Sequence, residues 1–123
     1  MENTNKKTLV IGASTKPERY SNIAIRMLRE YDHKVVALAK RAGLVDGVTI
    51  QTEFPIERNI HTVTMYLGAK HQPVYYSKIL NLKPQRVIFN PGAENDEFKK
   101  KLDSAGIETV ENCTLVMLRT DQF

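Results

Sequence analysis

The residues between Gly12 and Arg19 combine the chemical groups that proteins use to bind phosphate. They follow a short apolar run, Thr8 to Ile11, and precede Ser21 and Asn22, either of which could begin a helix. Glycine lets the backbone turn sharply and approach a ligand, hydroxyls donate hydrogen bonds, and lysine and arginine add positive charge. A helix that begins near Ser21 would direct its free N–H groups toward this loop. The pattern predicts a phosphate-binding loop between a strand and a helix, and the alternative is an ordinary tight turn.

The same loop lacks the glycine pattern of dinucleotide-binding enzymes. Of the three glycines in G-x-G-x-x-G only Gly12 is present, and Ser14 and Pro17 stand in the other two positions. Enzymes that use NAD usually place an acid at the end of the second strand for the ribose hydroxyls, whereas this chain has Ala39-Lys40-Arg41. A basic pair there argues against NAD and suits a ribose phosphate. Two ligands carry one, NADP at the 2′ position and coenzyme A (CoA) at the 3′ position.

No residues stand in a pattern typical of catalysis or metal binding. His71 is a candidate general base, but no carboxylate or nucleophile stands at an interpretable spacing from it, so we interpret it as a solvated loop residue. The single cysteine, Cys113, excludes an internal disulfide, and we expect a buried, inert thiol. No metal-ligand spacing occurs among the histidines and acids. We therefore predict neither catalytic residues nor a metal site.

Short strand-like runs alternate with helical patterns along the chain. The helical patterns cover Ser21 to Tyr31, Pro73 to about Leu82, and a segment around Phe98 and Leu102 that Gly106 ends. Between Lys40 and Asn59 we expect loops and one short edge strand. The strand-like runs are Thr8 to Ile11, Val35 to Leu38, Val63 to Leu67, Arg86 to Phe89 and Ile107 to Val110.

This alternation requires a mostly parallel sheet, because each strand must return in the same direction through a right-handed crossover. We predict an α/β fold: a small, doubly wound, Rossmann-like sheet of about five strands flanked by helices. In such folds ligands bind at the carboxyl ends of the strands, where Gly12 lies. Residues 1–123 are expected to form a single domain, with residues 1–6 flexible.

Composition and charge favour a small anionic ligand. The chain is 41% hydrophobic and 26% charged, as in ordinary soluble proteins, and carries a net charge of +4. Its Lys and Arg residues are spread along the sequence without interleaved aromatic pairs, so nucleic acid is an unlikely partner. No apolar run is long enough to span a membrane, and residues 1–7 lack the apolar core of a signal peptide. We expect a cytoplasmic protein without a membrane partner.

Several segments together resemble the small, single-domain CoA-binding proteins, which are similar to the nucleotide-binding domain of the succinyl-CoA synthetase α-subunit. The resemblance runs from about Lys7 to Phe123, with the segments in order and suitably spaced. One difference is that the family often has Asn-Pro after its second strand, where this chain has Ala39-Lys40. The matching segments are Val10 to Ser14, Pro17, Asn90 to Asn95 and Cys113 to Leu118.

The resemblance implies which residues hold CoA. In the family the first loop binds the CoA phosphates, the end of the second strand lies near the nucleotide, and the loop after the central strand helps to hold the pantetheine. Residues after a further strand, Asn90 to Gly92, can border the same crevice. The expected cofactor-binding residues are Gly12, Ala13, Ser14, Thr15, Lys16, Arg19, Tyr20, Ala39, Lys40, Arg41, Leu67, Gly68, Ala69, Asn90, Pro91 and Gly92.

Three functions agree with these observations. The first is non-catalytic binding of CoA or an acyl-CoA by a carrier, sensor or regulator. The second is an enzyme, either linked to NADP or acting on acyl-CoA. The third is a protein-interaction domain that has kept the fold and lost the ligand. We favour the first, because no nucleophile and base can be paired in the sequence.

Overall fold

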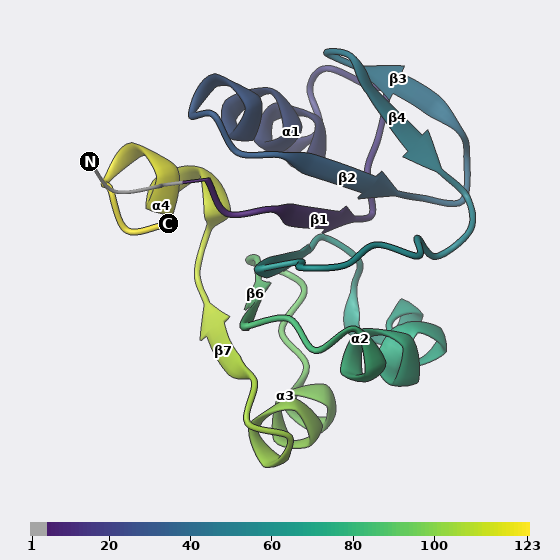
Figure 1. Cartoon of the computed structure of the whole chain (residues 1–123), viewed down its shortest axis with the longest axis vertical. Coiled ribbons are helices and arrows are strands. Elements are labelled where there is room, and N and C mark those ends of the chain that lie inside the picture. The colour runs from purple at the N-terminus through teal and green to yellow at the C-terminus, as the bar shows by residue number, and fades with distance from the viewer. Residues whose placement is uncertain (1–4) are drawn as a thin grey trace.

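A single seven-stranded sheet, covered by helices on both faces, forms the computed structural model, which describes residues 5–123 (Figure 1). The strand order is β3-β4-β2-β1-β5-β6-β7, and only the β3–β4 pair is antiparallel. The predicted Rossmann-like α/β fold is thus confirmed. The strands are β1 (Thr8–Ile11), β2 (Val35–Leu38), β3 (Gly43–Val45), β4 (Val48–Gln51), β5 (Thr62–Met65), β6 (Arg86–Phe89) and β7 (Glu108–Glu111).

Two strands more than the predicted five are present, because the segment after Lys40 folds into a hairpin. Its second strand, β4, coincides with the expected short strand but lies between β2 and β3, so the expectation of an edge position was wrong; the edge strand is β3, which was not expected. Asp46 and Gly47 connect them with φ angles of 48° and 80°. Two consecutive positive φ angles are typical of the tight hairpin turns that Asp-Gly favours, so this dipeptide was the signal for β3.

The helices begin and end close to the predicted positions, with local differences. Helix α1 (Tyr20–Glu30) has Arg19 as its N-cap, so the prediction of Ser21 or Asn22 there was wrong. Helix α3 (Asp96–Ser104) is capped by the Asn95 side chain, which accepts a hydrogen bond from Phe98 N at 3.0 Å. A last helix, α4 (Thr114–Arg119), was not predicted. No helix among residues 5–123 is both long and apolar enough to cross a membrane.

The segment after β5 is less regular than the single helix that the sequence suggested. Two 3₁₀ turns, η1 (Ala69–His71) and η2 (Pro73–Tyr75), precede the short helix α2 (Tyr76–Leu82). Ile79 is buried, whereas Val74 is 70% exposed. These turns therefore present Val74 at the surface and leave only the later part of the segment to pack on the sheet.

Alternating side chains of the central strands enter two separate cores. Leu9 and Val63 pack with Ile79, Phe98 and other residues on the face covered by α2 and α3. Val10 packs with Leu28, among others, on the face covered by α1 and α4. Because both faces of the strands are buried, the sheet is a rigid support for the loops at its edges.

The amino end of the described chain is attached to the loop before β2. Lys34 N donates to Asn5 Oδ1 at 2.9 Å, and Lys6 N donates to His33 Nδ1 at 2.9 Å. Residues 5 and 6 of the segment that we expected to be flexible are therefore held by hydrogen bonds. The other four, residues 1–4, lie outside the described residues.

A buried amide links three elements beneath the carboxyl edge of the sheet. Asn90, which is 2% exposed, donates through Nδ2 to Thr64 Oγ1 at 2.7 Å and to Met65 O at 2.9 Å. Its Oδ1 accepts from Thr114 N at 2.9 Å. The hydroxyls of Thr64 and Thr114 also lie 2.8 Å apart. This network ties β5, β6 and the start of α4 together.

Replacing Asn90 with alanine is expected to lower the free energy of unfolding by about 2–4 kcal/mol, because it leaves several buried polar groups without partners. Urea unfolding of the purified variant measures this. Asn81→Ala is the matched control: its side chain is exposed and should change stability by less than about 0.5 kcal/mol. Equal stabilities of the two variants would contradict the structural role of the Asn90 network.

Candidate functional site

Four loops leave the carboxyl edge of the sheet at the same level. Ile11 is in register with Leu38 of β2 and with Met65 of β5, and Met65 is in register with Phe89 of β6. The loops that follow these strands are therefore neighbours. Gly12 N and Ala13 N donate to Leu38 O at 3.0 and 3.2 Å, which joins the first loop to β2.

Two cavities open at this edge, and Gly12 lines both. We call them the Lys40 cavity, of about 440 Å³, and the Arg19 cavity, of about 400 Å³. The Lys40 cavity is lined by Gly12, Ala13, Ala39, Lys40, Leu67, Lys70, His71, Pro73, Val74 and Tyr75. The Arg19 cavity is lined by Gly12, Ser14, Glu18, Arg19, Tyr20, Ser21, Tyr66 and Pro91.

The loop between β1 and α1 is held by the helix that follows it. Asn22 Nδ2 donates to Ser14 O at 2.9 Å. Arg26 donates through Nε to Asn22 Oδ1 at 2.8 Å and through Nη2 to Pro17 O at 3.1 Å. Ser14 Oγ accepts from Lys16 N at 3.1 Å, so this hydroxyl closes a local turn. The loop is therefore ordered by its own contacts.

Gly12 is the residue that brings the first loop against the loop after β5. Its φ of 92° lies in the region that favours glycine. A Cβ atom at this position would lie 3.2 Å from Leu67 Cδ2 and 3.3 Å from Leu67 N. The close approach of these two backbones thus depends on the missing side chain, and it sets the junction between the two cavities.

The electrostatics of the site favour an anion. Helix α1 has no side-chain hydrogen bond at its N-cap and no acidic residue in its first turn, so its terminal N–H groups are uncapped. Lys40, Lys70 and Arg19 add positive charge, and within residues 5–123 none of them forms an ion pair. Glu18 is the single acidic residue in the lining of the two cavities.

Tyr66 contributes a polar group without a partner. Its hydroxyl is buried and makes no hydrogen bond with the described residues, and the side chain lines the Arg19 cavity. Burial raises the pKa of Tyr66, so the phenol stays protonated and keeps a donor. The hydroxyl lies beside the side chains of Thr114 and Thr64, toward the interior of the protein.

The structure brings together about half of the predicted site residues. Thr15 instead packs toward β3, Asn90 is buried in its network, and Gly92 N donates to Glu94 Oε1 at 2.9 Å. The predicted residues that line a cavity are Gly12, Ala13, Ser14, Arg19, Tyr20, Ala39, Lys40, Leu67 and Pro91. Those that line neither are Thr15, Lys16, Arg41, Gly68, Ala69, Asn90 and Gly92.

Sequence reasoning missed the cavity residues contributed by η1 and η2. His71 was considered only as a base, and Lys70, Pro73, Val74 and Tyr75 were placed in a helix or left aside. Glu18, Ser21 and Tyr66 of the Arg19 cavity were also missed.

The groups that could perform chemistry are not assembled in pairs. His71 is exposed and has neither a hydrogen bond nor an ion pair to its side chain in the described part of the chain. Cys113 is half-buried at the N-cap of α4, not fully buried as expected. Among residues 5–123 there is no group of three or more His, Cys, Asp or Glu side chains that could hold a metal ion.

Comparison with known proteins identifies similar sequences and structures. The family described as "CoA binding domain" matches residues 6–119. The crystal structure of an uncharacterized protein is 43% identical, with a TM-score of 0.95 over 98% of this chain and 100% of that chain. A hypothetical protein from Pyrococcus horikoshii is 27% identical, with a TM-score of 0.86 over 97% of this chain and 84% of that one. A protein from Thermus thermophilus, 22% identical over 97% and 91% of the two chains, shares the fold at a TM-score of 0.86. The search of curated proteins gives no significant match.

Gly12 and Gly68 are expected to differ in how alanine changes the stability of the protein, because Gly12 has a positive φ angle and Gly68 does not. Gly12→Ala should lower the free energy of unfolding by about 1–3 kcal/mol, through backbone strain and the contact with Leu67. Gly68→Ala should leave stability unchanged or raise it by up to about 1 kcal/mol, since Gly68 has a φ of −63° and open space around its Cβ position. Thermal and urea unfolding of both variants test this, and similar losses in both would refute the role assigned to Gly12.

Proposed function

Because this chain belongs to the CoA binding domain family, we propose that it binds CoA or an acyl-CoA without catalysing a reaction. The observation that carries the proposal is the junction at Gly12, where two cavities meet beside the uncapped start of α1. In CoA, a diphosphate joins the 3′-phosphorylated adenosine to the pantetheine arm. The junction suits the diphosphate, and the two cavities suit the parts of CoA on either side of it, the phosphorylated adenosine and the pantetheine.

The donor set at the junction agrees with the chemistry of CoA. The diphosphate would accept from N–H groups at the start of α1, with the guanidinium of Arg19 beside it. Lys40 and Lys70, in the other cavity, would bind the 3′-phosphate of the ribose. The basic dipeptide Lys40-Arg41 supports a ribose phosphate and not the two free hydroxyls of NAD.

The pantetheine arm would lie in the Arg19 cavity, whose lining includes Tyr66 and Pro91. The arm is uncharged and carries two amides and the thiol or thioester. Tyr66 would contribute its side chain to the wall beside this arm, because its hydroxyl is buried away from the cavity. Tyr20, which is 71% exposed, supplies apolar surface at the rim.

An NADP-linked enzyme and an enzyme acting on acyl-CoA are the alternatives. NADP shares the ribose phosphate with CoA, and only the position of that phosphate differs. The exposed His71 and the half-buried Cys113 are the side chains that either reaction would have to use. Neither has a base or acid paired with it in the described residues, which supports binding without catalysis.

CoA is expected to bind more tightly than dephospho-CoA, by about 10- to 100-fold, because the 3′-phosphate makes charge-assisted contacts with Lys40 or Lys70. NADP should bind more weakly than CoA, and NAD should not bind measurably. Isothermal titration of the purified protein with the four ligands gives this ranking. Equal affinities for CoA and dephospho-CoA would remove the role of the basic residues, and a preference for NADP would support the second function.

Two neighbouring cations of the first loop should differ in their effect on CoA affinity. Arg19→Glu is expected to weaken binding by about 10- to 100-fold, since Arg19 lines the cavity at the start of α1. Lys16→Glu makes the same change of charge three residues earlier, outside both cavities, and should weaken binding less than about fivefold. Both variants should keep the stability of the parent protein. Equal affinities of the two variants would contradict a direct contact between Arg19 and the diphosphate.

A further inference from the structure

A cavity of about 550 Å³ lies at the amino edge of the sheet, opposite the junction at Gly12. Thr8 of β1 is in register with Val35 of β2 and Thr62 of β5, and Thr62 is in register with Arg86 of β6. The residues directly before these four are therefore neighbours at this edge. We call the hollow the Lys34 cavity, and its lining includes all four of them: Lys7, Lys34, His61 and Gln85.

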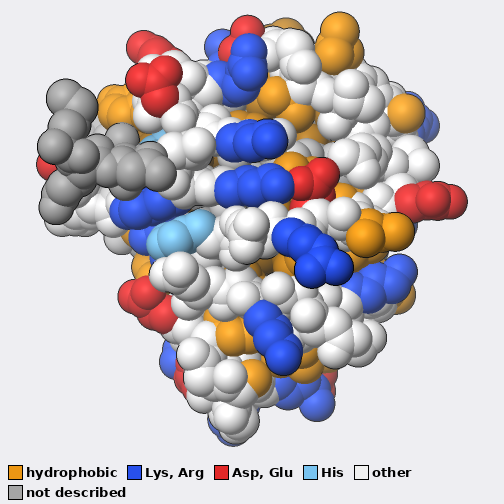
Figure 2. Space-filling view, in the orientation of Figure 1, with side chains coloured by type: hydrophobic (Ala, Val, Ile, Leu, Met, Phe, Trp, Pro, Cys, Tyr) orange, Lys and Arg blue, Asp and Glu red, His pale blue; other side chains and the backbone are white. Residues whose placement is uncertain are grey.

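Positive charge exceeds negative charge in the lining of the Lys34 cavity. Among residues 5–123, none of those that line it is acidic. Lys34 and Lys83 are exposed and form no ion pair in the described part of the chain. Lys7 pairs with Glu57, and its ammonium group also donates to Arg58 O at 3.2 Å. Lys and Arg side chains likewise dominate the middle of the face that Figure 2 shows. Two free ammonium groups thus attract an anion to this edge.

A buried cation beside the cavity adds to this positive potential. Arg86 is 7% exposed and forms no ion pair among residues 5–123. Burial lowers the pKa of His61, and the positive charges of Arg86 and Lys6 lower it further. Glu108 acts in the opposite direction but does not reverse the shift. A buried charge without a counter-ion is costly, so a nearby anion would stabilise Arg86.

Uncharged hydrogen-bonding groups accompany the lysines. Thr62 Oγ1 accepts from Arg86 Nε at 2.8 Å and lies 2.7 Å from His61 Nδ1. The described residues offer the buried Thr62 hydroxyl no other acceptor, so it donates to Nδ1 and leaves the proton of the neutral imidazole on Nε2. The imidazole of His61 thus keeps one N–H donor. Residues with side-chain amides also line the cavity, namely Asn5, Asn59 and Gln85.

Lys83 occupies a position that favours glycine. It follows the last residue of α2 with a φ of 54°, and its N–H donates to Ile79 O and Leu80 O at 3.3 Å. Left-handed residues at this place after a helix are usually glycine, because a side chain there costs free energy. Asn59, also in the lining, has a φ of 64°. What lysine adds at position 83, against this cost, is its charge.

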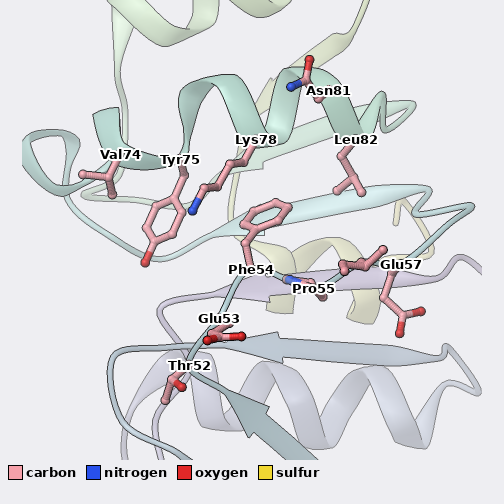
Figure 3. A pocket seen from close by; sticks show the side chains of 11 residues that line it. Thr52, Glu53, Phe54, Pro55, Glu57, Val74, Tyr75, Lys78, Asn81 and Leu82 are labelled. Atoms are coloured by element: carbon pink, nitrogen blue, oxygen red, sulfur yellow. The ribbon is translucent and has the colours of Figure 1, made fainter.

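A larger groove next to the Lys34 cavity lacks this excess of positive charge. It measures about 820 Å³, lies between residues 52–57 and α2, and shares Leu82 with the cavity (Figure 3). Figure 3 shows Glu57 and Leu82 at the same end of the groove. The charged residues in the lining of the groove are two acids, Glu53 and Glu57, and one cation, Lys78. The preference for an anion is therefore confined to the Lys34 cavity.

We propose that the Lys34 cavity binds a small phosphorylated molecule, with Lys34 and Lys83 as the cations that contact its phosphate. The site goes beyond the proposed function, since it lies at the edge of the sheet away from Gly12 and does not require CoA. Lysine ammonium groups suit phosphate, and the amides suit its remaining oxygens or the hydroxyls of the same molecule. The described lining has no Phe, Tyr or Trp on which bases could stack, which favours a small molecule over nucleic acid.

Titration of the full, ¹⁵N-labelled chain with inorganic pyrophosphate, followed by NMR, tests the proposal. KCl keeps the ionic strength constant, because exposed charges respond to salt. The amide signals of Lys34, His61 and Lys83 should shift together and saturate, with a dissociation constant of about 1 mM or lower. Pyrophosphate that binds beside α1 instead moves the signals of Gly12 and Arg19, so each site is read separately.

Two substitutions remove one cation each. Lys83→Gly and Lys34→Gln should weaken the binding read at His61 by about 5- to 20-fold. Lys83→Gly should not lower the stability of the protein, since glycine favours the φ at this position. Lys78→Gln is the matched control, because it removes an exposed lysine of α2 that lies outside the cavity. It should change this binding less than about twofold, and so should Arg19→Glu at the opposite edge.

Three results would overturn the proposed site. Signals at the amino edge that do not saturate would show that pyrophosphate screens the charges without binding. Equal losses in Lys78→Gln and Lys83→Gly would mean that the net charge of the protein, and not the cavity, determines the affinity. A single-stranded oligonucleotide that binds this edge at least about tenfold more tightly than pyrophosphate would replace the small molecule with nucleic acid.

Discussion

The register of four parallel strands is the constraint on which the whole carboxyl edge depends. The ends of β2, β1, β5 and β6 lie side by side because their ladders pair residue for residue from Thr8 to Ile11 and onward across the sheet. Both faces of these strands are buried, so a shift of one residue would turn the core side chains to the wrong face. The level at which each loop leaves the sheet, and hence the place where the cavities meet, follows from this pairing.

Buried amides fix the loops that backbone pairing cannot reach. Gln72, which is fully buried, donates through Nε2 to Leu67 O at 2.9 Å and to Ala93 O at 2.8 Å, and so joins the loop after β5 to the loop after β6. Asn95 Nδ2 donates in turn to Gln72 Oε1 and to the hydroxyl of Tyr76. Asn90 likewise joins the residue after β6 to Met65 of β5 and to Thr114 at the start of α4. The shape of the site is thus set by side chains that do not face it.

The sequence predicted what depends on local pattern and missed what depends on distant contacts. The strands, the α/β class and the loop after β1 follow from apolar runs, turn residues and charge near one another in the chain. Gln72 and Asn90 are polar residues that any pattern places at the surface, and only the three-dimensional neighbours Ala93, Thr64 and Thr114 explain their burial. The exposure of Val74 likewise depends on two 3₁₀ turns, whose geometry a helical pattern does not distinguish from an α-helix.

The hairpin of β3 and β4 packs against Thr15 of the first loop, a residue that lines neither cavity. A Cβ atom at Gly43 would lie 2.4 Å from Thr15 Cγ2, closer than side chains can approach, so the two positions share one small volume. Substitutions at positions 15 and 43 are therefore coupled. A larger residue at position 43 requires a smaller one at position 15, or a loop of another length. Gly43, which lines neither cavity, therefore limits which residues the loop between β1 and α1 can have at position 15.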